Sequence, residues 1–151
     1  MRSFIDTNVL IYADDPEASG KQAVALSVIA EHLRAGIGVI STQVLHEFVN
    51  AATRKLALPL DVIRSRVRLY SRFEVATASV AAVLEALELR TLHQVSYWDA
   101  LILQAARDSG CTRLLTEDMQ AGAMIGGVHV VNPFATPAAP ATARTAKAKR
   151  R

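Results

Sequence analysis

The chain has 151 residues, 51% of them hydrophobic, which suits one domain with a buried core and excludes general disorder. Its net charge of +3 is unevenly spread: the last 17 residues hold five basic residues and no acid, whereas the first 134 hold 12 basic and 14 acidic residues. A single cysteine excludes an internal disulfide, and no apolar stretch reaches the roughly 18 residues of a membrane span. We therefore expect a cytoplasmic protein without membrane contact.

Short apolar runs alternate with longer amphipathic segments along the chain. The first apolar run ends at Asp6, and Thr7 is placed to cap a short helix. Gly36 and Gly110 are expected to end helices. The predicted strands are the run that ends at Asp6 and residues 37–40, 74–77, 112–115 and 128–131; the predicted helices are residues 7–12, 21–35, 42–56, 61–72, 79–92 and 96–108.

Strands that alternate with helices predict an α/β fold in three layers, α/β/α, around a mostly parallel central sheet of about five strands. Residues 1–134 are expected to form this domain. From 135 to 151 the chain is rich in Ala, Pro, Thr and basic residues, a composition typical of a disordered tail. The tail is either a nonspecific nucleic-acid contact or a solubilising extension, and we leave both open.

Two acidic residues follow apolar strands. Asp6 ends the first strand, where an unpaired buried charge would be costly, although an aspartate there is also an ordinary helix cap. Asp118 follows the strand that ends at Leu115, where an acid is also common in a turn. Its neighbour Glu117 could take the same role.

Two further acidic residues lie on predicted helices. Asp99 begins a helix that is apolar nearly all round, so we expect it to point inward, although its place three residues after Ser96 also fits a capping box. Glu47 lies at the edge of the polar arc of its helix, where a glutamate is usually solvated. Trp98, beside Asp99, is expected in the core rather than as a base-stacking residue.

Together these acids point to one edge of the sheet. Ligands of open α/β sheets bind beyond the carboxyl ends of the strands. Asp6 and Asp118 lie at such ends, and Asp99 begins a helix that can reach the same edge. Carboxylates that converge there repel one another unless a cation lies between them. Oxygen ligands favour Mg²⁺ or Mn²⁺, and no Cys or His pattern has the spacing of a zinc site. Such a site can activate a water for attack on phosphorus.

The segments that carry these acids resemble the PIN-domain family, in particular the VapC-type toxins of bacterial and archaeal toxin–antitoxin pairs. They occur in the family's order and with family-like spacing, at residues 4–12, 41–48, 97–101 and 115–119. The resemblance implies a Mg²⁺- or Mn²⁺-dependent endoribonuclease with four catalytic acids, Asp6, Glu47, Asp99 and Asp118. Asp6, Asp99 and Asp118 would hold the metal, and Glu47 would bind, orient or help to deprotonate the attacking water.

The resemblance also implies supporting residues and partners. Asn8 is expected to order the loop around Asp6, and Thr116 to orient the acid two residues on. The partners would be an RNA substrate, a small VapB-like antitoxin that inserts a segment into the active-site groove, and a second copy of the chain in a homodimer.

Basic residues on two predicted helices are candidates for holding RNA. Arg64, Arg68 and Arg72 recur at a spacing of four and form a stripe that could follow phosphates, or could simply be a solvated face. Arg54 lies about two turns beyond Glu47 and could flank the groove.

Two other functions stay open at this point. One is a PIN-like module that binds RNA or a partner without cutting, although all four acids are present. The other is a metal-dependent phosphatase of another α/β fold. The Asp-x-Asp pattern of haloacid-dehalogenase-like phosphatases is absent after the first strand, because the second position is Asn8.

Overall fold

The sheet has six strands in the order β3-β2-β1-β4-β6-β5 in the computed structural model, which describes residues 1–135. All neighbours pair in parallel except β5 and β6, which are antiparallel. The mostly parallel sheet is confirmed, with one strand more than expected, because the extra strand β5 has two residues and is too short to give a hydrophobic pattern. The strands are β1 (Ser3–Ile5), β2 (Gly38–Ser41), β3 (Glu74–Ala76), β4 (Arg113–Leu115), β5 (Met124–Ile125) and β6 (Val128–Val131).

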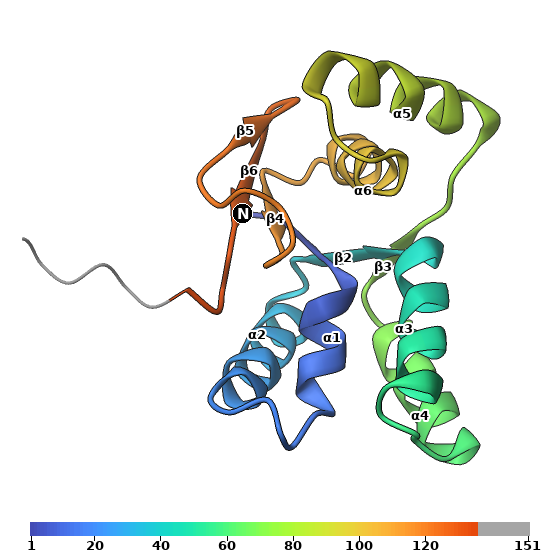
Figure 1. The fold of residues 1–151 in the computed structure, drawn as a ribbon, viewed down its shortest axis with the longest axis vertical. Helices are drawn as coiled ribbons and strands as arrows, with labels where there is room; N and C mark the ends of the chain where they lie inside the picture. The colour runs from blue at the N-terminus through green and yellow to red at the C-terminus, as the bar shows by residue number, and fades with distance from the viewer. Residues whose placement is uncertain (136–151) are drawn as a thin grey trace, which may run out of the picture.

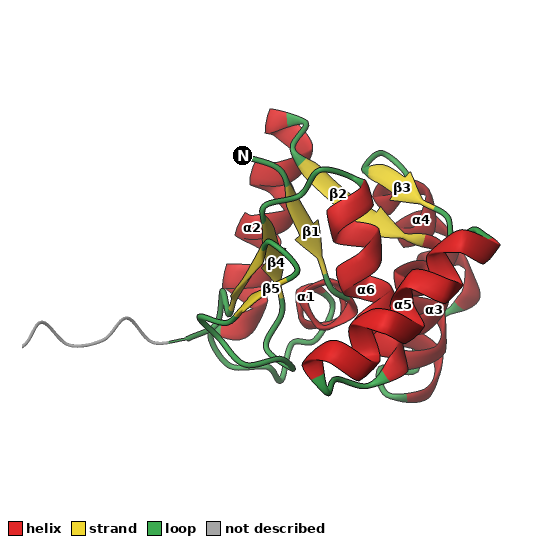
Figure 2. Cartoon of the chain, turned by 90° about the horizontal axis from the view of Figure 1, so that it is seen from above, coloured by secondary structure: helices red, strands yellow, loops and turns green. Residues whose placement is uncertain are grey.

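Helices cover both faces of the sheet and complete the predicted α/β/α layers. The helices are α1 (Thr7–Ala13), α2 (Lys21–Ala35), α3 (Thr42–Arg54), α4 (Leu60–Tyr70), α5 (Val80–His93) and α6 (Tyr97–Asp108). Helices α1 to α4 lie on one side of the sheet, and α5 packs on α6 on the other side (Figure 1). The view from above shows α6 lying across the central strands with α5 outside it (Figure 2).

The core fills the space on both sides of the central strands. Phe4, Ile40 and Leu114 of the strands are fully buried, as are Phe48 of α3 on one face and Leu103 of α6 on the other. Each side chain of this kind stabilises the fold by about 1.5–3 kcal/mol. Packing on both faces therefore holds the carboxyl ends of β1 and β4 in place.

The start of α1 sets the first site residue. Asp6, not Thr7 as expected, is the N-cap of α1: its backbone is extended and its side chain accepts the N–H of Thr7, which is the first residue of the helix. The parallel register places Ile5 of β1 beside Leu115 of β4. The next residues, Asp6 and Thr116, therefore lie side by side beyond the two strands.

The structure bears only in part on two other expectations. Of the tail predicted at 135–151, all but Ala135 lies outside the described residues. Among residues 1–135, no helix is both long and apolar enough to cross a membrane.

Candidate active site

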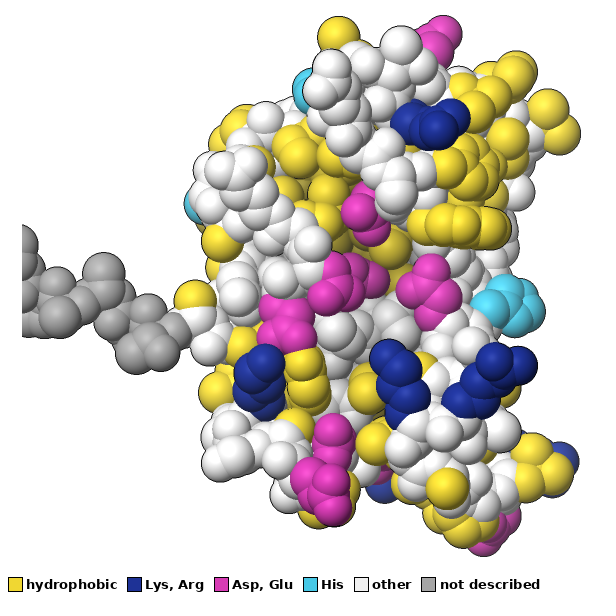
Figure 3. Space-filling model, viewed as in Figure 1, with side chains coloured by type: hydrophobic (Ala, Val, Ile, Leu, Met, Phe, Trp, Pro, Cys, Tyr) yellow, Lys and Arg dark blue, Asp and Glu magenta, His cyan; other side chains and the backbone are white. Residues whose placement is uncertain are grey.

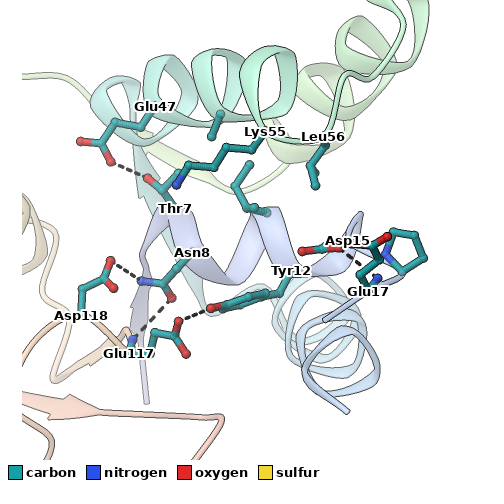
Figure 4. Close-up of a pocket in the computed structure, with 13 residues that line it drawn as sticks. Thr7, Asn8, Tyr12, Asp15, Glu17, Glu47, Lys55, Leu56, Glu117 and Asp118 are labelled. Carbon is teal, nitrogen blue, oxygen red and sulfur yellow. Dashed lines mark hydrogen bonds between the residues drawn. The ribbon is translucent and has the colours of Figure 1, made fainter. Parts of the chain in front are cut away.

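A cleft of about 720 Å³ opens over the carboxyl ends of β1 and β4. Its walls come from α1, the loop after α1, α3 and the loop after β4 (Figure 4). Acidic side chains gather in the middle of this face of the molecule, with Lys and Arg side chains below them (Figure 3). The polar residues of the lining include Thr7, Asn8, Glu47, Lys55, Glu117 and Asp118.

Asp6 does not itself line the cleft but is bonded to Thr7 of its lining, and it is only 4% exposed. One carboxylate oxygen accepts the N–H of Thr7 at 2.7 Å, and the other accepts the hydroxyl of Thr116 at 2.8 Å. Burial raises the pKa of Asp6 to about 6 although both bonds lower it, and the charges of Glu47 and Asp118 raise it further. Among residues 1–135, no positive charge therefore compensates the charged form of Asp6.

Thr116 and Asn8 connect Asp6 to Asp118. The hydroxyl of Thr116 donates to Asp6 and accepts both the Asn8 amide at 3.0 Å and the Asp118 N–H at 3.1 Å. These three bonds use the one donor and both acceptor positions of a hydroxyl. The Asn8 amide also donates to the Asp118 carboxylate at 3.1 Å. Two neutral side chains thus fix the relative positions of two acids that are 112 positions apart in the chain.

Glu47 is held from two sides. The Thr7 hydroxyl donates to one oxygen at 2.6 Å and the Gln43 amide donates to the other at 2.9 Å. Gln43 also donates to the backbone carbonyl of Trp98 at 3.3 Å, which links α3 to α6. Sequence reasoning missed the contacts of Thr7 and Gln43 with Glu47; the signal available for Gln43 was its spacing of four residues from Glu47 on one helix.

Asp99 is half-buried in the first turn of α6, and its N–H donates to Ser96 at 3.1 Å. Burial raises the pKa of Asp99, and the charges of Asp118 and Glu47 raise it further, while a hydrogen bond with Ser96 lowers it. The structure therefore brings Asp99 within electrostatic reach of the same acids that act on Asp6.

Glu117 is engaged elsewhere, although the sequence left it as an alternative to Asp118. Its carboxylate accepts the Tyr12 hydroxyl and forms an ion pair with Lys21 at 2.9 Å. Burial disfavours its charge, but the contacts with Tyr12 and Lys21 outweigh this and lower its pKa. The geometry thus favours Asp118, which is bound to Asn8, as the acid that joins the cluster.

The donor set fits a hard divalent cation. Among residues 1–135, no three His, Cys, Asp or Glu side chains stand close enough together to enclose an ion as they are. Asp6, Asp99 and Asp118 nevertheless offer only oxygen, and the charges of Glu47 and Asp118 contribute to the raised pKa values of Asp6 and Asp99. Mg²⁺ usually keeps several water ligands and binds one or two carboxylates directly, so a wider spacing of the acids still suits it.

The arginines predicted to hold RNA are exposed, but none of them lines the cleft. They are Arg54 in the last turn of α3, Arg64 and Arg68 on α4, and Arg72 just beyond α4. Their contact with RNA stays a prediction. Lys55, next to Arg54, does line the cleft and extends toward Thr7 (Figure 4).

The expectation that Trp98 lies in the core is wrong, because its side chain is 61% exposed. The buried face of α6 begins only at Ala100, so the first turn of the helix leaves residue 98 on the outside. The indole packs edge-on against Tyr97 with the ring centres 5.4 Å apart.

Comparisons with known proteins agree with this fold. The toxin–antitoxin complex from Klebsiella pneumoniae matches at 25% identity over 87% of this chain and 98% of that chain, with a TM-score of 0.62. VapBC2 from Rickettsia felis, bound to a DNA fragment from its promoter, matches at 21% identity over 86% and 97%, with a TM-score of 0.61. Mycobacterium tuberculosis VapC20, a Sarcin-Ricin loop cleaving toxin, matches at 19% identity over 77% and 91%, with a TM-score of 0.60.

The sequence itself gives one further finding. No curated protein matches the chain significantly. A family model described as the PIN domain, however, matches residues 3–122, which include all four acids of the cluster. Because this match spans most of the chain and the fold agrees with it, the protein belongs to the PIN domain family.

Proposed function

We propose that this protein is a metal-dependent endoribonuclease of the VapC toxin type. The observation that carries the proposal is Asp6, a buried carboxylate at the end of a central strand whose pKa is raised to about 6 by burial and by the charges of Glu47 and Asp118. An uncompensated buried charge in a cleft is typical of a functional site. Membership of the PIN domain family and the likeness to a toxin described as cleaving the Sarcin-Ricin loop support RNA as the substrate.

Asp6, Asp99 and Asp118 would hold Mg²⁺ or Mn²⁺, with Asn8 and Thr116 keeping Asp6 and Asp118 in position. When bound, the cation would stabilise negative charge on the phosphodiester and make a bound water more acidic. Mg²⁺ or Mn²⁺ is therefore expected to be required for cleavage.

Glu47 would orient the attacking water or accept its proton. Thr7 and Gln43 each bind one of its oxygens, so the carboxylate has a fixed direction at the rim of the cleft. Lys55, at the end of the helix that carries Glu47, would supply a positive charge for the RNA phosphate. In-line attack would leave a 5′-phosphate and a 3′-hydroxyl.

We also propose a VapB-like antitoxin partner and a homodimer. The Klebsiella and Rickettsia structures are toxin–antitoxin assemblies, and this chain matches them over 87% and 86% of its length. A segment of the antitoxin would occupy the cleft and exclude RNA from Asp6 and Glu47. Such a segment needs a basic side chain, because the cleft presents several carboxylates.

The experiment is cleavage-site sequencing of cellular RNA incubated with the purified full chain in Mg²⁺, in Mn²⁺ and with EDTA. The proposal predicts new 5′-phosphate ends at a restricted set of sites, present with either metal and absent with EDTA. Binding of RNA without new ends would indicate a non-cutting module. Metal-dependent release of phosphate from p-nitrophenyl phosphate without new RNA ends would indicate a phosphatase.

A further inference from the structure

A second hollow, of about 580 Å³, adjoins the acidic cleft on the other side of Glu47. We call it the Trp98 groove. One wall is formed by Trp98 and Leu101 of α6, and the other by Gln43, His46, Glu47 and Asn50 of α3. Hydrophobic side chains lie directly above and beside the acids on this face of the molecule (Figure 3).

The groove differs chemically from the cleft that it joins. Trp98 offers a flat aromatic surface that is 61% exposed, a large apolar area to leave in water beside a site. Gln43 is already bound to Glu47 and to the Trp98 carbonyl, whereas the polar side chains of His46 and Asn50 in the groove lining are exposed. These are hydrogen-bonding groups around an aromatic face.

We propose that the Trp98 groove binds a nucleobase of single-stranded RNA next to the scissile phosphate, stacked on Trp98 and contacted at its edge by His46 or Asn50. The proposal rests on the ribonuclease function given above. Glu47 belongs to both hollows, so a base in the groove is continuous with a phosphate in the cleft. Aromatic side chains with neutral donors and acceptors are the usual recognition surface for an unpaired base.

The occupant is a single-stranded base and not a duplex, because the flat face of a paired base is already covered by its neighbours. The groove volume lies within the range of about 300–1,000 Å³ that is typical of small-ligand pockets. The stack would also fix the register of the RNA, and with it the bond presented to Glu47.

Trp98 is the only tryptophan of the chain, so intrinsic fluorescence reports on the groove directly. The full-length Asp6→Asn protein is titrated in Mg²⁺ with short single-stranded oligoribonucleotides. The proposal predicts saturable quenching that is lost when one abasic nucleotide replaces the stacked base, and that is much weaker with a duplex of the same sequence. Quenching that is equal for the intact and all abasic strands would overturn the proposal.

Steady-state cleavage supplies the second readout. Trp98→Ala should raise KM by roughly tenfold or more, with a smaller change in kcat, because stacking of one base strengthens binding by that order. Trp98→Phe keeps a ring and should recover much of the loss. Leu92→Ala is the matched control, since Leu92 is a 75% exposed apolar residue of α5 outside the groove.

The outcomes separate this proposal from the proposed function. If quenching depends on the base but the wild type never cuts RNA, base binding in the Trp98 groove stands and the ribonuclease function is rejected. If the wild type cleaves RNA and Trp98→Ala leaves KM unchanged, the ribonuclease function stands and base binding in the Trp98 groove is overturned. The exposed indole would then be a contact for a protein partner.

Discussion

The acidic cleft and the Trp98 groove share Glu47 but are built differently. Beneath the residues of the cleft, Asp6 is almost completely buried and each of its oxygens has a hydrogen-bond partner. In the groove, the largest side chain, Trp98, is mostly exposed and contributes a surface instead of a charge. Substitutions in the two regions should therefore act differently: those at the acids should lower kcat and alter stability, whereas those in the groove should mainly raise KM.

The largest effect is expected from removing the charge of Asp6. Asp6→Asn should lower the cleavage rate by about 1,000-fold or more, because loss of the cation's charge stabilisation costs several kcal/mol and each 1.36 kcal/mol is tenfold. The fold should persist, because the asparagine keeps an oxygen that can cap α1. Cleavage rates and circular dichroism measured together check both statements. Wild-type cleavage by this variant would remove Asp6 from the site.

The same substitution should stabilise the metal-free protein at high pH. Burial raises the pKa of Asp6 from 3.8 to about 6, so the folded state binds more protons than the unfolded state between these values. The stability of the wild type therefore falls as pH rises through this window, by about 3 kcal/mol at 1.36 kcal/mol per pKa unit. In EDTA, Asp6→Asn should melt above the wild type at pH 8 and close to it at pH 4.

Thermal melts from pH 4 to pH 8, with EDTA and with Mn²⁺, make this comparison. Mn²⁺ should raise the melting temperature of the wild type at pH 8 and leave that of Asp6→Asn nearly unchanged. A variant that melts below the wild type at pH 8 would show that the buried charge is already compensated within the fold.

Neighbouring acids should differ in effect because only one of them belongs to the cluster. Asp118→Asn should lower cleavage by about 100-fold through loss of a metal-holding charge. Glu117→Gln should change it less than about threefold, because Glu117 is paired with Lys21 and surface ion pairs contribute little. The two rates are measured on one RNA under the same conditions. A reversed order would transfer the role to Glu117.

Loss of the hydrogen bonds that hold Glu47 should have an intermediate effect. Thr7→Val and Gln43→Leu should each lower kcat by about tenfold, the order expected for a hydrogen bond to a charged group, with little change in KM. Thr53→Val is the matched control, because the Thr53 hydroxyl only donates to the Val49 carbonyl within α3. An effect on KM alone would show that Thr7 and Gln43 do not act by orienting Glu47.

The smallest effects are expected outside both hollows. Arg64→Ala and Arg68→Ala on α4 should each weaken RNA binding by about threefold at low salt and reduce the log–log salt slope by about 0.7. Arg34→Ala, an exposed arginine on α2, is the control. Binding isotherms at several salt concentrations supply the slopes. Slopes that do not change would make the α4 stripe an ordinary solvated face.

Local patterns were enough to predict the layers and the position of Asp6. Strands β1 and β2 are short apolar runs followed directly by a helix, and Asp6 lies where the first run ends. Strand β5 was not predicted, because two residues are too few to show a hydrophobic period. The cap of α1 was misplaced by one residue, because Asp6 and Thr7 are both good N-cap residues and their order alone does not decide between them.

Long-range pairing and exposure were not predictable in the same way. Arg66 binds Asp14 with three contacts of 2.9 Å, although the two residues are 52 positions apart. The hydrogen bond from Thr116 to Asp6 depends on the register of β1 against β4, which no local sequence pattern reveals. Trp98 was misjudged because it follows Tyr97 in an apolar helix, and only the packing of α6 shows that its first turn projects beyond the core.

The acids around Asp6 are expected to bind a divalent cation, and Mn²⁺ titration by calorimetry at pH 7.5 tests this most directly. The full-length wild type should bind Mn²⁺ saturably, Glu117→Gln should bind it about as well, and Asp6→Asn should lose most of the heat. Equal Mn²⁺ affinity in the wild type and Asp6→Asn, or no saturable binding in the wild type, would show that Asp6 and its neighbouring acids do not form a cation site.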